Sequence, residues 1–150
     1  MSQPASDIFL SDVLDRPVIS HSGREIGRHW DVAMSPGDPL PVVSHVLVKK
    51  GGVVRRVAWQ DLALFNRVVV SLRGEGNTLP ELAECDDEIL VRRDILDKQI
   101  VDVDGARVVR VNDIRMNIVR GLLCVASVDV GFRGILRRLG WLGAWDACAE

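Results

Sequence analysis

Cysteine is scarce in this sequence. The three cysteines, Cys85, Cys124 and Cys148, are odd in number and widely spaced, and no two of them form a CxxC pair. Disulfide-rich folds and zinc knuckles need paired or closely spaced cysteines, so both are excluded. Reduced thiols are typical of a cytoplasmic protein, and this is the location that we predict.

An excess of positive charge is also missing. The formal net charge is -2 at pH 7, whereas a nucleic-acid-binding domain usually carries a basic patch or stripe. We therefore expect no nucleic-acid partner. The sequence has no basic region followed by an apolar one at its start, and no run of about 18 apolar residues. We expect a chain that is neither secreted nor membrane-spanning.

What the sequence does contain is an internal repeat. Residues 12–34 and 94–116 align without a gap, 82 positions apart, with identical residues at Asp12/Asp94, Leu14/Leu96, Asp15/Asp97, Gly23/Gly105, Asp31/Asp113 and Met34/Met116. The same register continues into the valines that follow, so the repeating unit is a whole small domain. A unit of roughly eighty residues is marginal in burying its own core. We therefore expect the two copies to pack together or to pair with another chain.

The first copy has the pattern of a small β-domain. Residues 42–49 have the period of two that is typical of a strand, with one face made of Val42, Ser44, Val46 and Val48 and the other of Val43, His45, Leu47 and Lys49. Gly51-Gly52 is a strong hairpin connection into residues 53–59. Residues 60–65 are too short for more than a helical turn. Residues 67–72 are rich in β-branched side chains and predict a closing strand. Several short strands joined by tight turns predict a small sandwich or barrel.

The second copy follows the first only in part. Asp104-Gly105 predicts a type I′ hairpin, and the alternation of residues 122–130 places Cys124 in the core. From Gly131 the copies diverge, and no equivalent of the closing strand is found before Glu150. Either something else closes the second barrel, or the last strands of a longer chain lie beyond this end.

The predicted fold class is therefore all-β, with two tandem small antiparallel β-barrels and short helical turns. We place the first barrel (the first repeat) at residues 8–72 and the second (the second repeat) at residues 88–150, incomplete or closed by a partner. Residues 73–87 shift abruptly toward glycine, proline and acids, and predict the linker.

Both copies contain a short turn ending in Leu-Asp (Leu14-Asp15 and Leu96-Asp97), an extended run, a glycine turn and a strand carrying Asp31 or Asp113. In these features the chain resembles the PRC-barrel family, named for the H subunit of the photosynthetic reaction centre and also found in the ribosome-maturation protein RimM. The second copy is similar to PRC-barrel segments that precede MgtE-type and CBS domains in magnesium-transporter-like bacterial proteins, although no MgtE or CBS sequence is present. The resemblance implies a small antiparallel barrel used for protein contact or assembly.

The segment from residue 132 to 145 is the predicted partner-binding site. Apolar residues recur there at spacings of three and four, and three arginines supply a basic flank. Two interpretations stay open, and we favour the first: the segment plugs the open end of the second barrel, or it docks on a membrane surface or a partner protein. The residues assigned to this site are Phe132, Arg133, Leu136, Arg137, Arg138 and Trp141.

The remaining polar residues predict structural roles. Asp102, Asp104 and Asp113 begin like a calcium loop, but the rest of that pattern is missing, so we predict neither a metal site nor a cofactor. The aspartates that recur in both copies are expected to cap backbone N–H groups or to pair with arginine. The three histidines, His21, His29 and His45, are too scattered for a triad, and we expect them on the surface or in turns.

The function that we expect is non-enzymatic. A tandem PRC-barrel protein would act in assembly or regulation, with a link to a magnesium transporter suggested by the resemblance. Two alternatives stay open: a sensor of divalent ions such as Mg²⁺, and a RimM-like factor in ribosome assembly. Because small barrels with exposed strand edges often pair, we also expect a homodimer.

Overall fold

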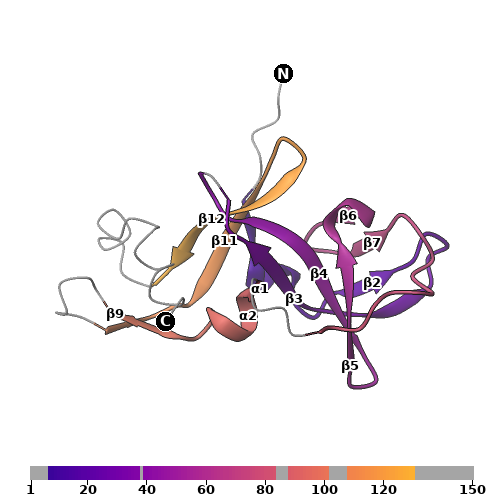
Figure 1. Cartoon of the computed structure of the whole chain (residues 1–150), viewed down its shortest axis with the longest axis horizontal. Helices are drawn as coiled ribbons and strands as arrows, with labels where there is room; N and C mark the ends of the chain where they lie inside the picture. Colours follow the sequence, from indigo (N-terminus) through magenta and orange to yellow (C-terminus); the bar gives the residue numbers. More distant parts are fainter. Residues whose placement is uncertain (1–6, 38, 84–87, 102–107, 131–150) are drawn as a thin grey trace.

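The computed structural model describes residues 7–37, 39–83, 88–101 and 108–130. These residues are mostly β-strand, which confirms the predicted all-β class (Figure 1). In chain order the elements are β1 (Ile8–Phe9), α1 (Leu10–Val13), β2 (Pro17–Ile19), β3 (Glu25–Ser35), β4 (Val42–Lys50), β5 (Val53–Ala58), the 3₁₀ turn η1 (Trp59–Asp61), β6 (Leu62–Phe65), β7 (Val70–Leu72), β8 (Ile89–Leu90), α2 (Val91–Asp94), β9 (Gln99–Val101), β10 (Val108–Arg110), β11 (Asp113–Val119) and β12 (Leu122–Asp129).

Tight turns with positive φ join the long hairpins. Gly51 and Gly52 have φ of 58° and 79° between β4 and β5, which confirms the hairpin predicted there. Arg120 and Gly121 have φ of 51° and 77° between β11 and β12. Two successive residues in this region form the type I′ turn, whose twist matches that of the strands on either side.

One ten-stranded sheet contains strands from both repeats. Its order is β1-β11-β12-β4-β3-β2-β7-β6, with β5 also beside β4 and β8 also beside β3, and β9 and β10 form a separate pair. In Figure 1, β3 and β4 cross the middle of the molecule, with the β11–β12 hairpin on one side and β2, β6 and β7 on the other. Since β2 and β7 run parallel, the sheet is mixed and not purely antiparallel. The helical turn predicted over residues 60–65 is correct only at its start, because Leu62–Phe65 is strand β6.

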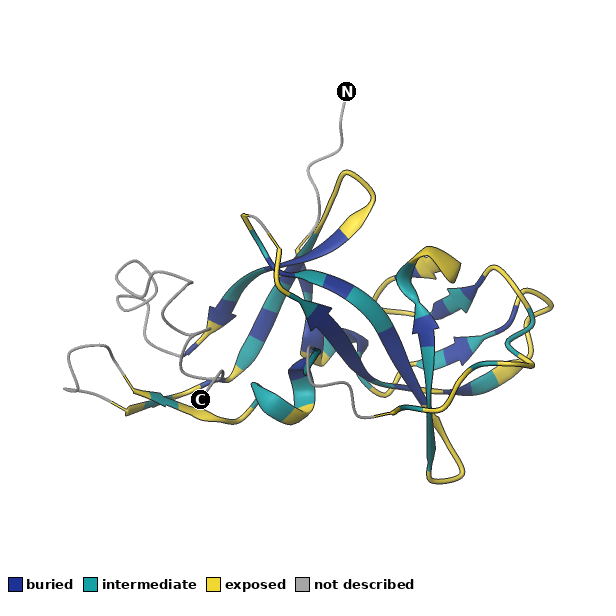
Figure 2. Ribbon diagram, in the orientation of Figure 1, coloured by how far each residue is buried: buried dark blue, intermediate teal, exposed yellow. Residues whose placement is uncertain are grey.

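The hydrophobic core is shared between the repeats. A single cluster joins buried side chains of the first repeat, such as Leu10 and Met34, to those of the second, such as Ile114 and Met116. Buried segments run along β3, β4, β11 and β12 in Figure 2. Cys124 is buried as predicted. Each repeat therefore covers apolar surface of the other, and the expectation that the two copies pack together is confirmed.

The duplication is visible in the backbone. The Asp15 N–H donates to the His29 carbonyl at 2.7 Å, and 82 positions later the Asp97 N–H donates to the Val111 carbonyl at 3.0 Å. Asp15 and Asp97 have φ of 63° and 62°, the left-handed region that few residues other than glycine adopt. Aspartate is tolerated there better than most, because its short side chain hydrogen-bonds locally. The repeated Leu-Asp pair thus marks a sharp change of chain direction in each copy.

This left-handed turn gives a first prediction. Replacing Asp97 with isoleucine should lower the free energy of unfolding by about 1–2 kcal/mol, because a β-branched side chain clashes at positive φ. Asp97→Gly is the matched control and should change it by less than about 0.5 kcal/mol, since glycine adopts this region freely but adds freedom to the unfolded chain. Urea denaturation measures both. Equal losses in the two variants would contradict the turn geometry.

Candidate functional site

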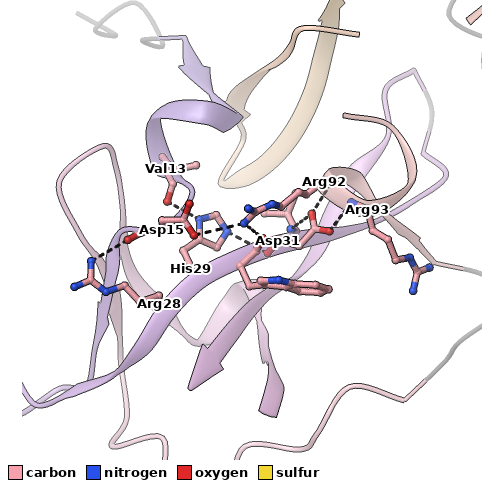
Figure 3. Close-up of polar contacts among 9 residues, drawn as sticks. Val13, Asp15, Arg28, His29, Asp31, Arg92 and Arg93 are labelled. Carbon is pink, nitrogen blue, oxygen red and sulfur yellow. Dashed lines mark hydrogen bonds and ion pairs between the residues drawn. The ribbon is translucent and has the colours of Figure 1, made fainter. Parts of the chain in front are cut away.

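Asp31 is the centre of a buried polar cluster between the repeats (Figure 3). Its carboxylate, fully buried on β3, accepts three backbone N–H bonds: from Val32 at 2.7 Å, Arg92 at 2.6 Å and Arg93 at 3.0 Å. Arg92 and Arg93 lie in α2, which has no side-chain cap from its own flanking residue. Burial raises the pKa of Asp31. The first repeat thus supplies the cap for the helical turn of the second.

Asp113 of the second repeat caps a helical turn of the first repeat. It lies on β11, 82 positions after Asp31, and its carboxylate accepts from the backbone N–H of Ser11 at 3.2 Å, the Ser11 hydroxyl and the Ile114 N–H at 2.8 Å. Ser11 belongs to α1 of the first repeat. The predicted backbone capping by these two aspartates is confirmed, and the structure adds that each one caps the other repeat.

His29 lies beside Asp31 in the core, so its predicted place on the surface or in a turn is wrong. Its Nδ1 is 2.8 Å from the Val13 carbonyl oxygen, and its Nε2 is 3.1 Å from that of Asp31. A neutral imidazole carries one N–H and can donate to only one of these oxygens. Burial lowers the pKa of His29, which favours this neutral form. The Phe65 ring packs edge-on at 5.6 Å between centroids.

Arg92 extends the cluster to the surface. Its guanidinium donates to the Trp30 carbonyl at 3.1 Å and lies 3.5 Å from the exposed carboxylate of Asp15, whose carbonyl accepts from Arg28 at 3.0 Å (Figure 3). The carboxylate of Asp31 and the guanidinium of Arg92 both have partners inside the protein, and these partners lie on the other repeat. The cluster can therefore hold the two repeats together.

A second cluster contains the residue types of a hydrolytic triad. The Ser44 hydroxyl donates to Glu88 at 2.8 Å, and both lie near the same ring nitrogen of His45, Nδ1, at 3.1 and 3.3 Å. A nucleophilic serine and its acid must instead use opposite nitrogens of the histidine. Arg56 also donates to Glu88. Because Glu88 precedes β8 and the other three lie on β4 and β5, this network is another anchor between the repeats.

A groove lies between the repeats. Its volume is about 740 Å³, and it lies between η1–β6 of the first repeat and the tip of the β11–β12 hairpin of the second. The Trp59 indole N–H donates to the Gly121 carbonyl at 2.8 Å and holds that tip in place. Leu64 and Leu122 line the groove with 53% and 47% of their surfaces exposed. Apolar side chains of both repeats therefore line the groove, beside polar ones such as Ser44, His45 and Arg73.

Metal ligands do not gather in the part of the chain that the structure describes, where no three His, Cys, Asp or Glu side chains are placed to hold an ion. Asp113 is engaged with Ser11. Asp102 and Asp104, the other two aspartates of the suggested calcium-like loop, lie outside the described residues.

The predicted partner-binding residues also lie outside the described residues, since all of them fall within 131–150. Sequence reasoning missed the groove because the alternation in residues 122–130 placed Leu122 on the inner face. In the structure Leu123 is buried and Leu122 is exposed. The adjacent pair Leu122-Leu123 was the available signal, because neighbouring residues of a strand point to opposite faces.

Comparison with known proteins identifies no relative. Neither a scan against protein-family models nor a search of curated proteins found a match to this chain. Among the described residues, no helix has the length and apolar character needed to cross a membrane. Any functional assignment therefore depends on the geometry of the clusters and of the groove.

Proposed function

We propose that this chain is a tandem PRC-type barrel protein that works as a non-enzymatic protein-interaction module in assembly or regulation. The observation that carries the proposal is the groove between the repeats, where exposed apolar side chains of both repeats meet. Clustered exposed apolar surface in a folded protein usually marks a site of contact with another molecule.

The occupant that we propose is an apolar segment of a partner protein with an acidic residue beside it. Arg73 lines the groove, and Arg120 stands at the adjacent hairpin tip, while no carboxylate is among the described residues that line it. Fully burying an exposed leucine contributes about 1.5–3 kcal/mol, and a side chain that is half exposed contributes about half of that. Leu64, Ile118 and Leu122 together could therefore supply much of the free energy of binding.

A non-enzymatic role is supported by the polar clusters. Asp31, His29 and Arg92 are occupied with one another and with backbone groups. Ser44 donates to Glu88, and both lie at the same nitrogen of His45, so this histidine is not placed between serine and acid as the base of a triad is. A purified chain that turned over a substrate, with a rate sensitive to one of these side chains, would contradict this part of the proposal.

The groove gives a second prediction. A photo-crosslinking amino acid at position 64 in cells should capture one defined protein, which is then purified and titrated against the chain by calorimetry. Leu122→Glu should weaken that binding at least tenfold, because it removes apolar contact and places a negative charge where we expect an acidic partner.

Val68→Glu is the matched control. Val68 is 76% exposed but does not line the groove, so this variant should bind within about twofold of the original chain. The proposal is wrong if the two variants bind equally, or if the protein captured at position 64 does not bind the purified chain.

A further inference from the structure

The second repeat has a strand edge that is covered in the first. β9 lies 82 positions after β2, and each pairs along one edge with the strand that follows it, β3 or β10. The other edge of β2 carries β7 in parallel, with Val18 opposite Val70 and Ile19 opposite Ser71. Among the described residues, no strand pairs with the corresponding edge of β9.

Side-chain exposure differs in the same way. Ile19 and Ile26 of the first repeat are half-buried. Their equivalents Val101 and Val108, which face each other across β9 and β10, are 59% and 60% exposed. Figure 2 shows the β9 arm extending from the main sheet with much of its surface exposed. An apolar pair that the first repeat covers is thus uncovered in the second, within the residues that the structure describes.

The backbone direction identifies the groups on this edge. The Val111 N–H donates to the Lys98 carbonyl at 2.9 Å, so Lys98 faces β10. In an antiparallel pair the backbone groups of successive residues point alternately to the two edges of the strand. The N–H and C=O groups of Ile100 therefore point toward β10, and those of Gln99 and Val101 point outward. In the first repeat the matching side is used: the His21 N–H, two residues after Ile19, donates to the Gly74 carbonyl at 2.9 Å.

We propose that the outer edge of β9 binds an extended segment of a partner protein, which adds to the sheet as a strand parallel to β9. β7 is the template for this segment: Val70 and Leu72 are buried, and Ser71 between them is half-buried. The expected ligand therefore has β-branched or aliphatic residues alternating with small polar ones, held by backbone hydrogen bonds. This site is separate from the groove and goes beyond the proposed function.

The parallel direction argues against a second copy as the occupant. Two identical strand edges related by a twofold axis perpendicular to the sheet meet antiparallel, because the axis reverses the strand direction. The corresponding edge of β2 binds β7 in parallel, so we expect the edge of β9 to bind its partner strand in parallel too. A different chain can supply it without that constraint.

The test is an NMR titration of the full chain with a peptide of the β7 sequence, residues 67–73. We expect saturable shifts of the Gln99 and Val101 amides and none with a scrambled peptide. Val101→Pro removes one outward N–H and should weaken binding at least tenfold. Val108→Pro removes an N–H from the opposite edge of the same hairpin and should bind within twofold, while unchanged core spectra show that both variants fold.

Four results would overturn the inference: no shift at β9, equal effects of the two peptides, equal loss of binding in the two proline variants, or prior occupation of the edge. The last is tested by a photo-crosslinker at position 99. A crosslink within the same chain assigns the edge to its own residues, and a crosslinked dimer that Val101→Pro abolishes assigns it to a second copy. Leu122→Glu should leave peptide binding unchanged, so failure of the groove and failure of this edge are distinguishable.

Discussion

Replacing Asp31 with alanine should lower the free energy of unfolding by about 3–5 kcal/mol. The substitution leaves three backbone N–H groups, those of Val32, Arg92 and Arg93, without their acceptor. An unsatisfied buried donor costs about 1–3 kcal/mol, and local rearrangement recovers part of the sum. Urea denaturation followed by circular dichroism measures the loss. This loss is a large fraction of the roughly 5–15 kcal/mol by which folded proteins are stable.

Asp113→Ala is the internal control for this result. Asp113 has the same place in the second repeat and caps α1, but it is only half-buried. Water can replace its carboxylate there, so the loss should be about 1 kcal/mol. Asp31→Asn should lie between the two, because the amide keeps one acceptor oxygen and turns an NH₂ group toward a donor. Equal losses for Asp31→Ala and Asp113→Ala would show that burial does not set the effect.

His29 should make the protein less stable in acid. Burial holds the pKa of His29 below its ordinary value of 6.5, which the unfolded chain retains. As pH falls through 6.5, the imidazole of His29 is protonated in the unfolded chain but stays neutral in the folded protein. The stability that neutral His29 contributes is therefore fully present only above pH 6.5. It is lost as pH falls from 6.5 toward the lower pKa of the folded protein.

The variant that tests this is His29→Val, since Val111 occupies the same position in the second repeat and is also buried. At neutral pH the variant should lose about 2–3 kcal/mol, because the carbonyl that accepts the imidazole N–H is left without a donor and packing against Phe65 is lost. Below pH 6.5 its stability should fall less steeply than that of the original chain. Unfolding free energies measured at a series of pH values give both quantities.

His21→Gln is the control, because His21 is exposed on a turn. This variant should keep both the neutral stability and the slope of the original chain. The hypothesis is wrong if His29→Val keeps the full slope below pH 6.5.

Local patterns predicted the local structure. The alternation in residues 42–49 and the Gly51-Gly52 turn gave β4, β5 and their hairpin, because strand period and turn chemistry are properties of neighbouring residues. The spacing of 82 likewise predicted that Asp15 and Asp97 occupy equivalent places, and their φ angles agree. The role of Asp31 as a backbone cap was also accessible, since aspartate competes well for free N–H groups.

The partners of these residues could not be predicted, because they depend on how the two repeats pack. Asp31 and Arg92 are separated by 61 positions, and no periodicity connects them. Burial of His29 follows from the meeting of β3 with α1 and Phe65, whereas a single histidine in the sequence resembles any surface residue. β6 was interpreted as a helical turn because four residues are too few to establish a period.

The exchange of caps between the repeats has a consequence for how the chain folds during synthesis. The cap of α1 comes from Asp113, which is synthesised 102 positions after Ser11. The cap of α2 comes from Asp31, on a strand that is synthesised earlier. Contacts between such distant residues slow folding, because a long loop must close before they contribute. We expect the first repeat to be only partly folded when it emerges from the ribosome. Both repeats then complete their folding together, after the second has been synthesised.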